Sequence, residues 1–162
     1  MGREDQTGFV HLARNDLPLK DCGFDGFELA VLEVSRRFFA AFAHPEEHGW
    51  MDAFEQAEQM FPPPFGATLA LAVSRTIRVL RSTRTTPFEY AHPSCQFCDK
   101  IITQEERYLI SILRAVRKER ASEAVTHALL VCEGGEPERL VAAFEALCVI
   151  IGEGPLASKP RP

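Results

Sequence analysis

Apolar residues recur at intervals of three and four along most of this chain, and this period constrains the fold more than any other feature. The first apolar stripe consists of Phe27, Val31, Val34, Phe38 and Phe42. Such spacing places side chains on one face of an α-helix. Asp25 is a favoured N-cap residue, and Pro45 disfavours a helical His44. We therefore predict a helix between them. Its charged residues lie off the stripe: Glu28, Glu33, Arg36 and Arg37.

Five further segments carry helical patterns. They cover residues 46–61, 67–82, 104–120, 122–133 and 137–152. The first of these is one helix or two turns broken near Gly49. Thr103 and Glu106 have the spacing of a capping box, which marks the start of the 104–120 helix. Pro62–Pro64 and Gly134–Gly135 are stop signals. Pro137 is a favoured first-turn residue.

Residues 83–102 do not follow the helical period. They contain two prolines, several β-prone residues and a pair of cysteines, and a short hairpin around the cysteines is plausible. The predicted fold class is all-α, an irregular bundle of about five to six helices with a small non-helical cysteine-bearing insert at about residues 83–102. We predict an N-terminal loop segment over 1–24, a single helical domain over 25–151 and a disordered tail over 152–162.

The composition points to a cytoplasmic protein that is not inserted in a membrane. The 162 residues carry a net charge of −5 and have no apolar stretch long enough to span a bilayer. The charged N-terminus has no secretory signal pattern. Five cysteines are an odd number, and in a reducing compartment neighbouring cysteines are better interpreted as metal ligands or a redox pair than as a disulfide framework.

Cys95 and Cys98 have the spacing of a zinc knuckle, which supplies two of the four ligands that zinc requires. His92 is close in sequence. Helix 104–120 starts just after the knuckle, and helix 122–133 returns antiparallel beside it, which brings Cys132 back toward the same end. We therefore predict a structural zinc site at 92–98, with Cys95, Cys98, His92 and Cys132 as ligands.

His127 and Cys22 are lower-ranked zinc ligands, and Cys148 fits a core position. Two other interpretations of Cys95 and Cys98 stay open. They are unligated thiols, or they form a thiol–disulfide switch.

Two alternative functions rest on other residues. A metal-dependent enzyme would use His44, His48 and His127, although Pro45 disrupts the helical spacing of the first two. A nucleic-acid-binding regulator would use the basic 75–120 region. Its candidate contacts are Arg75, Arg78, Arg81, Arg114 and Arg117. The second alternative requires that these arginines face one surface, whereas pairing with acids such as Glu28 within the fold is the competing expectation.

The favoured function is a binding or regulatory module with a structural zinc site, rather than an enzyme. The predicted partner is an unknown protein or a second copy of the chain.

Overall fold

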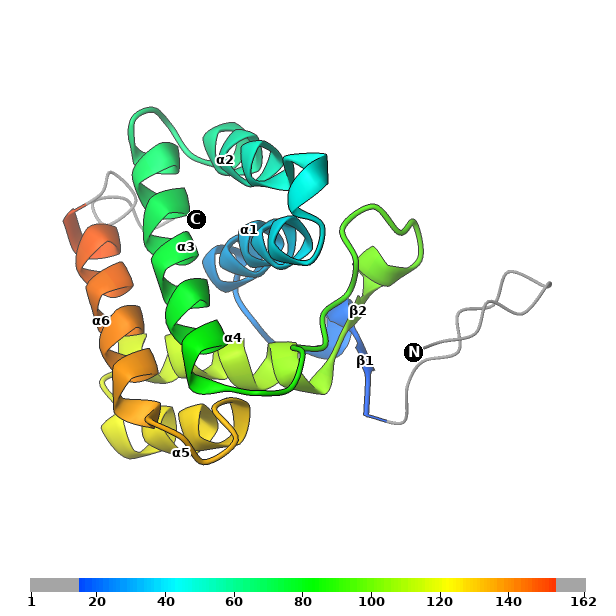
Figure 1. Ribbon diagram of the computed structural model, residues 1–162. Coiled ribbons are helices and arrows are strands. Elements are labelled where there is room, and N and C mark those ends of the chain that lie inside the picture. The colour runs from blue at the N-terminus through cyan, green and yellow to red at the C-terminus, as the bar shows by residue number, and fades with distance from the viewer. Residues whose placement is uncertain (1–14, 154–162) are drawn as a thin grey trace.

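The computed structural model in Figure 1 describes residues 15–153, apart from the side chains of Ile151 and Glu153. The helices in this range are α1 (Gly26–Ala43), α2 (Gly49–Met60), α3 (Phe65–Thr83), α4 (Gln104–Arg117), α5 (Ala121–Val131) and α6 (Pro137–Glu153). The shorter elements are strands β1 (Leu17–Pro18) and β2 (Ile101–Ile102) and 3-10 helices η1 (Leu19–Asp21), η2 (Pro45–Glu47) and η3 (Cys98–Lys100). The predicted N-terminal residues up to 14 and the tail from 154 lie outside the described residues.

Helix α1 packs against three other helices, α2, α3 and α4. Asp25 and Glu28 form a capping box at its start: the Glu28 N–H donates to the Asp25 carboxylate at 2.8 Å, and the Asp25 N–H donates to the Glu28 carboxylate at 2.9 Å. The helix ends at Ala43, before the predicted stop at His44 and Pro45.

Helices α2 and α3 form a hairpin that covers one side of α1. The predicted break near Gly49 is present, because His48 adopts a left-handed conformation (φ 53°) between η2 and α2. At Gly66 the two helices approach so closely that a Cβ atom would lie 2.7 Å from the Ala57 carbonyl oxygen and 2.8 Å from Glu58 Cα. Glycine at this position therefore permits the packing of the hairpin.

Helices α4, α5 and α6 complete the bundle. The predicted capping box starts α4, with the Glu106 N–H donating to the Thr103 hydroxyl at 3.1 Å. Helix α5 packs beside α4, and α6 runs next to α3 (Figure 1). The prediction of an all-α bundle of five to six helices is confirmed for the described part of the chain. None of the helices between residues 15 and 153 has the length and hydropathy of a membrane-spanning segment.

The small sheet differs from the hairpin expected around the cysteines. Among the described residues, β2 pairs antiparallel with β1, so that Leu17 faces Ile102 and Pro18 faces Ile101. The chain before α1 thus packs onto the insert, and residues 17–24 are part of the folded domain.

The core contains a buried charged pair. One of its two members, Arg36, was expected on the polar side of α1. Arg36 on α1 and Glu106 on α4 have side chains that are 1% and 0% exposed, and Arg36 Nε lies 2.8 Å from a Glu106 oxygen. The same two helices contribute apolar residues to the core, among them Leu32 and Phe39 on α1 and Leu109 and Ile110 on α4. The position of Arg36 outside the apolar stripe therefore did not predict its burial, because the apolar surface of α1 faces several helices.

Replacing Glu106 by alanine should destabilise the protein by about 3–5 kcal/mol, because Arg36 would remain buried without its partner charge. Urea denaturation followed by circular dichroism measures the change in the free energy of unfolding. The matched control is Glu123→Ala, which breaks the exposed Arg120–Glu123 pair and should cost about 0–1 kcal/mol. Equal losses in the two variants would contradict the importance of the buried pair.

Candidate functional site

Glu106 holds the cysteine-bearing segment between α3 and α4 at two points, one on each side of the two cysteines. Its carboxylate accepts hydrogen bonds from the N–H of Ala91 at 3.0 Å and the N–H of Thr103 at 2.9 Å. Arg36 donates to both Glu106 oxygens at 2.8 Å and to the Ile101 carbonyl at 2.7 Å. A single buried carboxylate therefore joins α1, α4 and both sides of the segment.

Arg84, the first residue after α3, makes a second attachment. It donates to the Val131 carbonyl at 2.8 Å and to the Glu105 carboxylate at 2.7 Å. Glu105 in turn accepts from the N–H of Glu89 at 2.5 Å, and the Thr103 hydroxyl donates to the Glu89 carbonyl at 2.8 Å. These bonds hold the first half of the segment against the start of α4 and the end of α5.

Glu133, just beyond α5, also holds the start of the segment. Its carboxylate accepts hydrogen bonds from the N–H and hydroxyl groups of both Thr85 and Thr86. The bond from the Thr86 hydroxyl, together with the other three, lowers the pKa of Glu133 to about 2. The folded-state pKa is depressed, so this attachment is present at neutral pH and weakens only as the pH falls from about 4.5 toward 2.

Aromatic side chains continue the attachment toward the cysteines. The ring of Phe39 on α1 stacks on Phe88, with centroids 4.4 Å apart, and on Tyr90 at 5.4 Å. Tyr90 stacks in turn on His92 at 6.2 Å. The chain is thus supported up to His92, where it turns outward.

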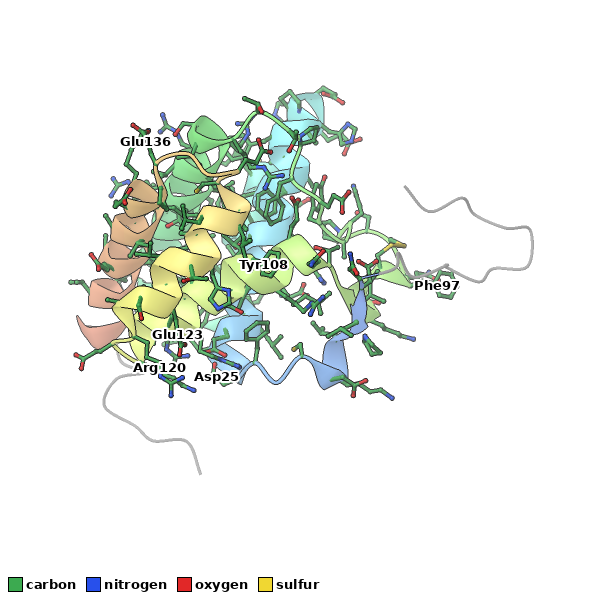
Figure 2. All side chains as sticks on the ribbon, turned by 90° about the horizontal axis from the view of Figure 1, so that it is seen from below. Asp25, Phe97, Tyr108, Arg120, Glu123 and Glu136 are labelled. Carbon is green, nitrogen blue, oxygen red and sulfur yellow. A yellow bond between two sulfur atoms is a disulfide. The ribbon has the colours of Figure 1, made fainter. Side chains whose placement is uncertain are left out.

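Beyond this support, Cys95 and Cys98 form a disulfide across a tight turn. The N–H of Cys95 donates to the His92 carbonyl at 3.1 Å, and the N–H of Cys98 donates to Cys95 Sγ at 3.3 Å. The two Cα atoms are 5.1 Å apart. Both cysteines are partly exposed, and Phe97 between them is 51% exposed. Figure 2 shows the disulfide at the edge of the molecule, close to the outward-pointing Phe97.

This arrangement supports thiol–disulfide chemistry at a surface turn. A disulfide with accessible sulfur atoms can be attacked by an external thiolate. Of the two sulfur atoms, Cys95 Sγ has a backbone N–H directed at it, that of Cys98.

Cys132 lies near the first residues of the insert and not near the turn that contains Cys95 and Cys98. It is buried at the end of α5, and its sulfur accepts a hydrogen bond from the Thr83 hydroxyl at 3.3 Å. Burial raises the pKa of the Cys132 thiol, which disfavours the thiolate that zinc needs. In Figure 1, α5 and the loop preceding β2 lie on opposite sides of the molecule. Arg84 explains the difference, since it joins α5 to the first residues of the insert.

The remaining metal-ligand candidates do not complete a set with the cysteine pair. His92 Nδ1 accepts from the N–H of Ser94 at 3.2 Å. Cys22 is a free thiol directly after η1, which packs against η3. Within residues 15–153, the one cluster of three or more potential metal ligands is the exposed group of His44, Glu46 and Glu47. Neither Cys95 nor Cys98 belongs to it.

The last cysteine and the three histidines of the alternative metal site lie elsewhere. Cys148 packs partly buried against the core, and burial raises its pKa to about 11. His44 and His48 are exposed at the junction of α1 and α2. His127 lies on α5, where its ring stacks on Tyr108 with centroids 6.3 Å apart. The fold thus separates His127 from the other two histidines.

The arginines of the nucleic-acid alternative divide into two groups. Arg114 and Arg117 on α4 pair with Glu28 at the start of α1, both at 3.1 Å. Arg75, Arg78 and Arg81 lie exposed on α3. The first group is paired within the fold, as expected for Glu28, and the second group lies on another helix.

Comparison of the chain with protein-family models, curated proteins and solved structures finds no match.

Native reduced protein should show two classes of thiol toward an alkylating reagent. Cys95 and Cys98 should react quickly, and Cys132 should react only on unfolding, because it is buried with a raised pKa. Mass spectrometry of proteolytic peptides after timed labelling measures each rate. In denaturant the rates should become similar. Fast native labelling of Cys132 would contradict its placement.

Proposed function

We propose that the protein is a cytoplasmic binding or regulatory module whose responsive element is the Cys95–Cys98 dithiol. The observation that supports this most is the disulfide at a partly exposed turn, directly next to a firmly attached segment. A redox change in such a turn alters the surface around Phe97 while the helical bundle persists. This difference between an attached base and an exposed tip is what a switch requires.

The proposed reaction is a thiol–disulfide exchange with a small disulfide such as oxidised glutathione. The Cys95 thiolate attacks one sulfur of the small disulfide, so that a mixed disulfide forms and one thiolate leaves. The Cys98 thiolate then attacks Cys95 Sγ, which closes the protein disulfide and expels the second thiolate. Two protein thiols are oxidised to one disulfide and one small disulfide is reduced to two thiols, so the two protons that the protein thiols lose end on the two expelled thiolates.

In glutathione buffers of increasing oxidation, Cys95 and Cys98 should lose their thiols together, and Cys22, Cys132 and Cys148 should keep theirs. Cys95 and Cys98 should react together because their disulfide needs both sulfur atoms. Acid quenching, alkylation and mass spectrometry measure the fraction of each state. The variant Cys95→Ser should abolish the paired step, and Cys22→Ser should leave it unchanged. A wild-type protein that keeps both thiols in the most oxidising buffer would overturn the proposal.

Structural zinc binding by the reduced pair is the second candidate function. It is favoured by the hydrogen bond from the Cys98 N–H to Cys95 Sγ, because an N–H directed at the sulfur also stabilises a zinc-bound thiolate. The pair supplies two of four ligands. Because Cys132 lies away from the cysteine turn, the other two ligands would have to be groups other than Cys132.

Metal analysis of the reduced protein tests this candidate. Zinc should be present in the wild type, absent from Cys95→Ser/Cys98→Ser and retained in Cys132→Ser, because Cys132 lies against Thr83 and not at the turn. Metal-free reduced wild type would exclude zinc and leave the disulfide switch. Loss of zinc in Cys132→Ser would instead show that Cys132 is one of the four zinc ligands.

A further inference from the structure

A small cavity lies between the α1–α2 junction and the residues just before the cysteine turn. It is lined by α1, η2, the start of α2 and the insert, whose loop before β2 lies beside this junction in Figure 1. Its volume is about 80 Å³. A cavity holds a water molecule from roughly 10–15 Å³ upward, so this one has room for a small ligand. We call it the junction pocket, and its lining includes Arg37, Glu47, Asp52, His92, Pro93 and Ser94.

The junction pocket contains two carboxylates that the fold leaves without a partner. Glu47 on η2 and Asp52 on α2 are exposed, and neither side chain makes a hydrogen bond or an ion pair with another residue between 15 and 153. An ionised carboxylate only accepts hydrogen bonds, and its strongest bonds are with charged donors. These two side chains can therefore bind an ammonium group.

The same pocket contains donors for an anionic group. Arg37 Nη1 donates to the carbonyl and to the carboxylate of Glu33, both at 3.0 Å, whereas its Nε and Nη2 groups make no hydrogen bond in the described part of the chain. His92 Nδ1 accepts from the Ser94 N–H at 3.2 Å, so the hydrogen of the neutral ring lies on Nε2, which is a donor. The Ser94 hydroxyl is a further donor. The pocket thus combines acceptors for a cation with donors for an anion.

A metal ion does not fit these groups. A metal ion holds its ligand atoms at about 2.0–2.6 Å, so the ligand atoms must lie close to one another. Among the described residues, the group of three potential ligand atoms within 4.8 Å of one another belongs to His44, Glu46 and Glu47. Neither Asp52 nor His92 is part of it. A ligand that contacts both sides of the junction pocket must therefore be a molecule with separate charged groups.

The side of the pocket that the insert provides is continuous with the cysteine turn. Cys95 follows Ser94 directly, and its N–H donates to the His92 carbonyl at 3.1 Å. The disulfide joins Cys95 to Cys98 and closes the turn. Reduction removes this constraint from Cys95 and from the adjoining pocket residues, while the helices that form the rest of the pocket stay in place. The redox state of the turn thus changes one side of the pocket only.

We propose that the junction pocket binds a small zwitterion, such as a free α-amino acid, and that it binds this ligand more tightly in the disulfide form. The ligand's ammonium group donates to Glu47 and Asp52. Its carboxylate accepts from Arg37 and His92. The disulfide orders the side of the pocket that the insert provides, so less entropy is lost when the ligand binds. This inference rests on the proposed dithiol switch and supplies a ligand for the binding module.

Titration of the isotope-labelled protein with glycine tests the pocket, with the NMR shifts of the Gly49 and Ser94 amides as the measurement. At constant ionic strength, glycine should shift both amides of the disulfide form. Ethylammonium lacks the carboxylate and acetate lacks the ammonium, so each should bind about tenfold more weakly, because a charged hydrogen bond is lost. The reduced protein and Cys95→Ser/Cys98→Ser should bind glycine about fivefold more weakly than the disulfide form.

Variants that keep the size of the side chain test the two carboxylates. Asp52→Asn and Glu47→Gln should each weaken glycine binding about tenfold, because each removes one charged acceptor. The matched control is Glu55→Gln, which removes the same charge from an exposed position of α2 outside the pocket lining and should bind like the wild type. Circular dichroism establishes that each variant is folded, and the two pocket variants test the site independently of each other.

The outcomes separate this inference from the proposed function. A wild type without glycine-induced shifts, equal binding of glycine and ethylammonium, or unchanged binding in both pocket variants would overturn the zwitterion site. Equal glycine affinity in the two redox states would overturn the redox control of the pocket. It would leave the dithiol switch intact, because alkylation measures that switch without the ligand. Failure of Cys95 and Cys98 to form their disulfide in any glutathione buffer would overturn both proposals.

Discussion

The buried hydrogen-bonded pair of Arg36 and Glu106 is the interaction on which the rest of this structure depends. It joins α1 to α4 in the interior, and the same carboxylate receives the backbone N–H groups of Ala91 and Thr103. Removing one partner of such a pair costs about 3–5 kcal/mol. That is a large part of the roughly 5–15 kcal/mol that stabilises a typical domain. A pair of apolar residues could fill the same space, but it could not bind the backbone of the insert.

This pair accounts for the contrast within residues 84–103. The segment has no helix of its own apart from η3, yet Arg84 and Glu133 hold its start, the ring of Phe39 packs on its first half, and Glu106 holds it at Ala91 and at Thr103. The turn containing Cys95 and Cys98 lies between the Ala91 and Thr103 contacts. A local change at the two sulfur atoms can therefore remodel the tip without opening the bundle, which is the basis of the proposed switch.

The sequence predicted the helices well because each has a local signal. The capping box at Thr103, the proline after α1 and the break near Gly49 act over three or four residues. The contacts that build the site have no such signal. Strands of two residues show no period, so the pairing of Leu17 with Ile102 could not be predicted. Glu106 was visible as a cap but not as the partner of Arg36, seventy residues away. The sequence predicted that Cys132 returns to the start of α4. Arg84 joins this end of α4 and α5 to the first residues of the insert, and not to the cysteine turn.

Amide hydrogen exchange of the oxidised and the reduced protein, compared by mass spectrometry, tests this account most directly. The account predicts that reduction increases exchange in the turn from about residue 93 to residue 100, while the N–H groups of Ala91 and Thr103 keep their protection because they donate to Glu106. Exchange that is identical in the two states would contradict a responsive turn. Loss of protection at Ala91 and Thr103 on reduction would contradict the claim that the buried pair holds the base of the segment independently of the disulfide.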